Sequence, residues 1–147
     1  MREWCDNFYF LNPPLKPLPE RAPVNRERVA LGRQLFNDPR LSANNTLSCA
    51  SCHQLDKGGA DTRARSLGFD GKPVPFNTPT VLNASLNFRQ FWDGRVETLE
   101  EQADNVITSP HEMGGDWKTV VQRITDDPDY RKAFDGAYQD AVTQANI

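Results

Sequence analysis

The chain has few of the side chains that usually bind metals or carry redox chemistry: its 147 residues include three cysteines, two histidines and two methionines. It also lacks any run of about 18 apolar residues, which excludes a membrane-spanning helix. The chain also has no large excess of either charge: 17 Lys and Arg residues against 20 Asp and Glu residues give a net charge of −3. Nucleic-acid-binding domains usually carry a basic excess, so we expect no nucleic-acid partner.

The N-terminal segment differs in composition from the rest of the chain. Residues 1–24 contain five prolines, which remove amide donors and favour an extended segment on the surface. No apolar stretch follows Met1, so a cleavable signal peptide is not visible. We expect residues 25–147 to form one folded domain of ordinary size.

Helix-capping residues and apolar spacing predict an all-α fold with long irregular loops. Four residues that favour the N-cap position each precede a stretch with helical periodicity: Asn25, Thr98, Asp116 and Asp127. The first helix should end at Asp38-Pro39, and the second near Ile107. No segment has a convincing strand pattern.

A short helix is expected around Cys49–Gln54, followed by a long loop over residues 56–79. This loop is rich in glycine and proline and shows no sustained periodicity. Loops of this length in a compact domain are usually functional or wrap around a ligand.

Two cysteines and a histidine form the motif Cys49-Ala50-Ser51-Cys52-His53. This is the spacing of c-type haem attachment. Two thiols one helical turn apart can form thioethers with the vinyl groups of one porphyrin, and the next residue can present an imidazole to the iron. The motif therefore predicts covalent haem c bound through Cys49 and Cys52, with His53 as the proximal ligand.

Other interpretations of these cysteines have less support. A thioredoxin-like pair would need a βαβ context, which is not seen. A zinc site could use Cys49, Cys52, His53 and His111, but structural zinc sites usually combine two separated ligand pairs. Cys5 is left over as a free thiol that can link two chains under oxidising conditions, so a homodimer stays open.

The sixth coordination position of the iron separates two functions. A haem with Met or His in that position transfers electrons, whereas an open face can bind peroxide. The segment His111-Glu112-Met113 offers two such ligands and a carboxylate. The glycines that follow it are equally typical of a surface loop.

Several ordered motifs between residues 28 and 138 resemble the bacterial dihaem cytochrome c peroxidases. They are Leu31-Gly32, Leu35-Phe36 with Asp38-Pro39 and Leu41-Ser42, Ser48–His53, Asn77 with Pro79–Asn83, Phe91–Arg95, Leu99-Glu100 with Gln102-Ala103, and Pro110 with Glu112-Met113. The resemblance is to the first, peroxidatic haem domain of that family and implies a cytochrome c-like fold. The second haem domain is not in this chain, so we expect a part of a longer protein, with a natural single-haem relative as the alternative.

The resemblance implies roles for individual residues. Glu112 is implied to be the distal acid–base that moves a proton between peroxide oxygens, and Gln102 to line the same pocket. Trp92 is implied to lie on the electron path from the second haem, although it is equally compatible with a core position. Asn77 is implied to contribute to a calcium site between the two domains.

The chain also departs from the family at three places. Many members carry a removable histidine ligand in the loop before Asn77, where this chain has Phe69. An open peroxidatic haem is therefore implied. Asn105-Val106 replaces the usual Gly-Pro of the family, and His111 beside Glu112 is a further candidate ligand or proton donor.

Together these observations predict the peroxidatic haem domain of a periplasmic enzyme that reduces hydrogen peroxide, because haem c attachment normally follows export. Its electrons would come from a second haem domain or a small redox protein. Two alternatives remain: a monohaem electron carrier with Met113 or His111 on the iron, and a related dihaem oxidase that acts on a protein substrate.

Overall fold

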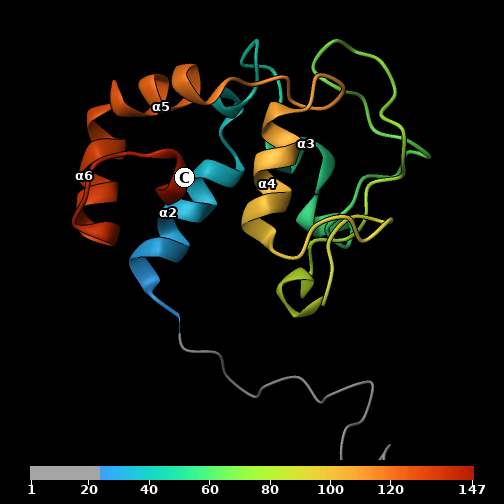
Figure 1. The fold of residues 1–147 in the computed structure, drawn as a ribbon, viewed down its shortest axis with the longest axis horizontal. Coiled ribbons are helices and arrows are strands. Elements are labelled where there is room, and N and C mark those ends of the chain that lie inside the picture. Colours follow the sequence, from blue (N-terminus) through green and yellow to red (C-terminus); the bar gives the residue numbers. More distant parts are fainter. Residues whose placement is uncertain (1–23) are drawn as a thin grey trace, which may run out of the picture.

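The computed structural model describes residues 24–147, which fold into helices joined by long loops (Figure 1). The α-helices are α2 (Arg26–Phe36), α3 (Cys49–Cys52), α4 (Leu99–Thr108), α5 (Trp117–Thr125) and α6 (Pro128–Tyr138). Short 3₁₀ helices cover Pro39–Leu41, Leu55–Lys57, Ala84–Leu86 and Gln144–Asn146. Within residues 24–147 no strand forms, and two isolated bridges pair Leu67 with Pro73 and Gln90 with Val96. The predicted all-α class is confirmed, while Cys5 and nearly all of the proline-rich segment lie outside the described residues.

The predicted N-caps form where the sequence places them. The side chain of Asn25 accepts a hydrogen bond from the Arg28 amide at 2.9 Å and so begins α2. Asp116 and Asp127 accept amide hydrogen bonds in the same way at the starts of α5 and α6. Thr98 and Glu101 cap each other reciprocally at α4. These local bonds satisfy amides that a helix start otherwise leaves without partners.

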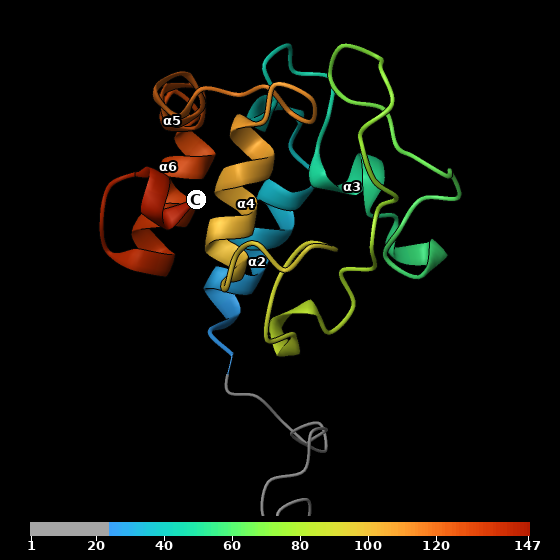
Figure 2. The ribbon, with the colours of Figure 1, turned by 45° about the vertical axis from the view of Figure 1, so that its right-hand side comes forward.

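The hydrophobic core lies between α2, α5 and α6. Val120 and Ile124 of α5 and Phe134 of α6 are completely buried, and Leu31 and Leu35 of α2 pack in the same cluster. Figures 1 and 2 both place α4 between this bundle and the loops that follow α3. The molecule thus has a packed helical side and a loop-rich side.

Helix α3 is shorter than the predicted Cys49–Gln54. It ends at Cys52, because His53 adopts φ −106° and ψ 73° and leaves the helical region. The carbonyl oxygen of Gln54 then accepts hydrogen bonds from the amides of Lys57 and Gly59, which closes a tight turn instead of a further helical turn. As a consequence, the His53 ring is free to face the loop that follows.

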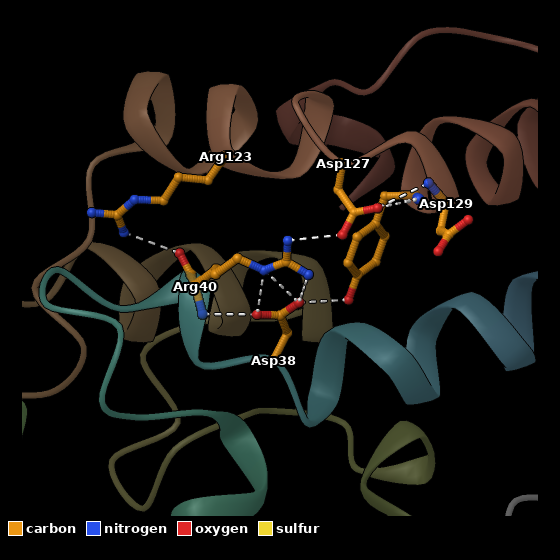
Figure 3. A network of polar contacts seen from close by, with 6 residues as sticks. Asp38, Arg40, Arg123, Asp127 and Asp129 are labelled. Atoms are coloured by element: carbon orange, nitrogen blue, oxygen red, sulfur yellow. Dashed lines mark hydrogen bonds and ion pairs between the residues drawn. The ribbon is translucent and has the colours of Figure 1, made fainter.

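A polar network joins the end of α2 to α5 and α6 (Figure 3). The buried Asp38 carboxylate accepts hydrogen bonds from the amide and guanidinium of Arg40 and, at 2.8 Å, from the Tyr130 hydroxyl. Arg40 also pairs with Asp127 at 2.9 Å. Arg123 donates to the carbonyl oxygens of Arg40 and of the two residues Ser42 and Ala43. The network fixes the chain direction directly after Phe36, a residue of the cavity wall described next.

Candidate haem and peroxide site

A cavity of about 650 Å³ lies between α3 with its following loops and the segment from α4 to Met113. Such a volume is in the range of small-molecule and cofactor sites. Most of its lining is apolar, with Phe36, Leu47, Val81 and Ile107 among the contributors. All seven residues assigned from the sequence to haem attachment, catalysis, electron transfer or calcium line it: Cys49, Cys52, His53, Asn77, Trp92, Gln102 and Glu112.

The two cysteines of the motif have free thiols that face the cavity from α3. Burial raises the pKa of the Cys49 thiol to about 11 and also raises the pKa of Cys52. Both groups are therefore neutral thiols near pH 7, unlike the low-pKa cysteine of a redox pair. Among the residues that the structure describes, no three His, Cys, Asp or Glu side chains are arranged to hold a metal ion. The zinc alternative thus has no ligand cluster there.

The ring of His53 is oriented by a single backbone contact. Its Nδ1 lies 3.1 Å from the carbonyl oxygen of Gly59. Because a carbonyl can only accept, the neutral ring carries its proton on Nδ1, and its Nε2 lone pair is then available to a metal. Phe36 flanks the ring, with the two ring centroids 6.5 Å apart.

Gly59 is a site residue that sequence reasoning did not identify. It has φ +77°, and a Cβ there would lie 2.9 Å from the Thr80 hydroxyl and 3.1 Å from the Val81 amide nitrogen. The Val81 amide also donates to the Gly59 carbonyl at 3.2 Å. Close approach of residues 80–81 therefore requires glycine at this position, and the paired glycines 58–59 were the available signal.

Glu112 faces the cavity from the wall that carries Gln102 and His111. Burial raises the pKa of its carboxyl above the usual value, against a hydrogen bond from Ser109 and the positive charge of Arg95. A half-buried carboxyl beside an open cavity can accept a proton as the carboxylate and release it again as the acid. The positions of Glu112 and Gln102 thus agree with the roles that the resemblance implies.

Phe69 is not one of the residues that line the cavity; Ser66 and Leu67 of the same loop take that position. Its ring packs instead against Gly114. Met113 and His111 both line the cavity, Met113 as a buried member of the core cluster and His111 as an exposed residue. The two candidate sixth ligands of the electron-carrier alternative are therefore both near the site.

Trp92 and Asn77 lie at the edge of the cavity. The Trp92 side chain is 66% exposed, which excludes the core position, and its indole N–H donates to the Asn77 carbonyl oxygen at 2.8 Å. The Asn77 amide nitrogen donates to the carbonyl oxygens of Arg63 and Ala64. Asn77 is the one calcium ligand named from the sequence, so calcium binding at this position stays a prediction.

The residues present fit a covalently attached haem. Two thiols on one helical turn, an imidazole with a free Nε2 and a largely apolar cavity are the features that such a group needs. A haem site is therefore indicated by the chemistry of the two thiols and the imidazole, together with the apolar cavity beside them.

Comparison with known proteins also indicates a haem protein. A family profile described as di-haem cytochrome c peroxidase matches residues 26–147. The chain is 42% identical to cytochrome c peroxidase Ccp of Escherichia coli K12 over 92% of its own length, and 41% identical to cytochrome c551 peroxidase of Nitrosomonas europaea over 90%. It is also 42% identical to the methylamine utilization protein MauG of Methylorubrum extorquens over 88% of its length.

A solved structure supports the assignment. The structure of a MauG-like protein associated with microbial copper homeostasis superposes with a TM-score of 0.79 and 33% identity over 92% of this chain. This chain belongs to the di-haem cytochrome c peroxidase family. It spans 30% of the Escherichia coli protein, 40% of the Nitrosomonas protein and 43% of the solved chain.

Proposed function

We propose that this chain is the peroxidatic haem domain of a dihaem cytochrome c peroxidase, which reduces hydrogen peroxide to water. The observation that carries the proposal is that His53 and Glu112 line one cavity from different segments, with the cysteines of the attachment motif beside the histidine. A haem site with a carboxylate acid–base in the same cavity is suited to peroxide chemistry.

Each residue has a part in the proposed reaction. When bound, haem iron supplies the position where peroxide coordinates. Cys49 and Cys52 would hold the porphyrin, and the Gly59 carbonyl keeps the His53 ring oriented with Nε2 available. Glu112 accepts the proton from one peroxide oxygen and returns it to the other, so that water can leave. Gln102 orients the bound peroxide by hydrogen bonding.

Electrons reach this domain from elsewhere in the proposed enzyme. Reduction of one peroxide to two waters consumes two electrons and two protons. We assign delivery to a second haem domain or a small redox protein, with the exposed Trp92 at the cavity edge as the relay. Exposed apolar side chains in the same segment, Leu86 and Phe88, support a partner surface there.

The proposal also covers location and calcium. Attachment of haem c follows export, which supports the periplasm. No helix in the described part of the chain is long and apolar enough to cross a membrane. A calcium ion at Asn77 would need further oxygen ligands from another part of the protein, and no step of the reaction depends on it.

Spectroscopy of the haem-loaded chain tests the proposal against the electron-carrier alternative. We expect haem to stay on the polypeptide after acid–organic extraction, and we expect the ferric form to bind cyanide and react with peroxide without prior reduction. A fully low-spin ferric spectrum that is lost in His111→Ala or Met113→Ala would instead establish the carrier. Oxidation of a protein substrate in place of a cytochrome donor would establish the oxidase alternative.

A further inference from the structure

The turn that carries Glu112 is held firmly on its α4 side. We call residues 109–115 the Glu112 turn. The amide of Gly115 donates to the carbonyl oxygen of Ile107 at 2.6 Å, and the amide of Gly114 donates to that of Ser109 at 2.8 Å. The Met113 carbonyl oxygen accepts from the Ala43 amide at 2.9 Å. These bonds fix the ends of the turn.

On its other side the Glu112 turn contacts the loop over residues 66–74, which we call the 66–74 hairpin. This hairpin is closed by its own hydrogen bonds, from the Gly68 amide to the Lys72 carbonyl at 2.8 Å and from the Val74 amide to the Ser66 carbonyl at 2.9 Å. The bridge between Leu67 and Pro73 adds to this closure. These contacts hold residues 66–74 together as one closed unit.

Phe69 makes the principal contacts between the two segments. Its amide donates to the Glu112 carbonyl oxygen at 2.8 Å, and its own carbonyl oxygen accepts from the Asn44 side-chain amide at 3.0 Å. Its ring lies against Gly114, which has φ +61°, so close that a Cβ on Gly114 would overlap the ring. Gly68 approaches the His111 carbonyl oxygen so closely that a side chain there would overlap it as well. Two glycines, one on each segment, thus allow the approach.

We propose that Phe69 is a positioning residue for Glu112. Its ring on Gly114 and its amide on the Glu112 carbonyl keep the 66–74 hairpin against the back of the Glu112 turn. The carboxylate is thereby held toward the cavity, while Phe69 itself stays out of it. The proposal rests on the proposed function insofar as Glu112 is the acid–base.

A positioning role for Phe69 and a purely space-filling role predict different effects of removing its ring. If Phe69 only filled space, its removal would lower stability and leave the Glu112 turn unchanged. If Phe69 positions Glu112, its removal should loosen the turn and misplace the carboxylate. Misplacement of a catalytic group by about 1 Å can cost about 10²-fold in rate.

A double-mutant cycle of Phe69→Ala and Gly114→Ala on the haem-loaded chain tests the proposal. Amide hydrogen exchange at Gly115 and at residue 114 reports the turn, and the second-order rate with peroxide and its pH profile report the carboxylate. We expect Phe69→Ala to speed amide hydrogen exchange at residues 114 and 115 and to lower the second-order rate with peroxide by about 10²-fold. The acid limb of the pH–rate profile should move to lower pH, because Glu112 becomes solvated. Phe69→Leu should restore much of each. Val29→Ala, at a 56% exposed residue of α2 outside the cavity lining, should change none of them.

The coupling between the two positions gives the sharpest result. Gly114→Ala should also speed exchange, but by a smaller factor in the Phe69→Ala background, because the added methyl then meets no ring. Additive effects, or a Phe69→Ala protein with parent exchange and parent pH profile, would overturn the inference. A parent protein inert to peroxide overturns the proposed function instead, and the exchange measurements then still decide whether Phe69 holds the turn.

Discussion

Gly59 shows how much of the haem site depends on one backbone carbonyl. That carbonyl accepts from His53 Nδ1, and a hydrogen bond of this kind makes the imidazole a more basic ligand. A more basic ligand stabilises ferric over ferrous iron. The contact should therefore lower the reduction potential of the haem.

Gly59→Ala should raise the midpoint potential of the bound haem, because the added Cβ displaces the Gly59 carbonyl from His53. Gly58→Ala is the matched control: Gly58 has the same φ of +77° but open space around its Cβ position. Both variants carry the left-handed alanine cost of about 1–2 kcal/mol. Potentiometric titration of the two proteins checks this, and an equal potential in both would refute the role of the contact.

At the same scale, the motif residues could be predicted from the sequence, whereas the paired glycines 58–59 could mark a turn but not the role of Gly59 in the site. Cys49, Cys52 and His53 are close in the chain, so their spacing alone states the chemistry. The need for glycine at position 59 comes from residues 80–81, more than 20 positions away. The place of the Phe69 ring could not be predicted either, because it depends on contact with Gly114, a residue 45 positions further along the chain.

At the scale of the elements, the junction of α2 with α5 and α6 contains a polar network around the buried Asp38 carboxylate. Burial alone would raise the pKa of the Asp38 carboxyl, but hydrogen bonds from Arg40 and Tyr130 outweigh it and hold this pKa below its usual value. A lowered pKa in the folded state stabilises the protein above the unfolded-state pKa of about 3.9. This stabilisation is lost as the pH falls through the lowered folded-state pKa.

Asp38→Asn should lower the free energy of unfolding at pH 7 by about 1.5–3 kcal/mol, because it removes hydrogen bonds to a charged group. The variant should also lose less stability than the parent between about pH 4 and the acid transition. Tyr130→Phe removes one of these bonds and should cost about 1 kcal/mol. Urea denaturation at several pH values measures all three proteins, and an unchanged acid dependence in Asp38→Asn would contradict the assignment.

Helix starts could be predicted from the sequence where a capping residue is present. Asn25, Thr98, Asp116 and Asp127 each begin the helix predicted from them, since a cap needs only its own first turn. The end of α3 had no such signal. It is set by the turn at Gln54 and the contact of His53 with Gly59, which belong to the site and not to helix propensity.

At the scale of the whole molecule, Trp92 is the residue that we propose as the electron relay to the site. The chain spans less than half of each relative reported above, and Trp92 is exposed at the cavity edge. An indole in this position can pass electrons to the cavity from a partner.

Trp92→Phe should slow turnover with a reduced electron donor while the reaction of the ferric haem with peroxide keeps its parent rate. Stopped-flow mixing separates the two steps in the enzyme that includes its second haem domain. Phe76→Leu is a control at another exposed aromatic residue of the cavity lining. Equal turnover in Trp92→Phe and the parent would remove Trp92 from the electron path.

The most direct test of the account is the rate at which the ferric haem-loaded chain reacts with peroxide in Glu112→Gln and His111→Gln. Glu112→Gln keeps the size and hydrogen-bonding capacity of the side chain but cannot accept a proton, so the rate should fall by about 10²–10⁴-fold. His111→Gln changes the adjacent cavity residue and should keep the parent rate. Because burial raises the pKa of Glu112, the parent rate should decline with falling pH at a value above 4.5, and this limb should vanish in Glu112→Gln. A parent rate in Glu112→Gln together with a large loss in His111→Gln would contradict the account and assign the acid–base to His111.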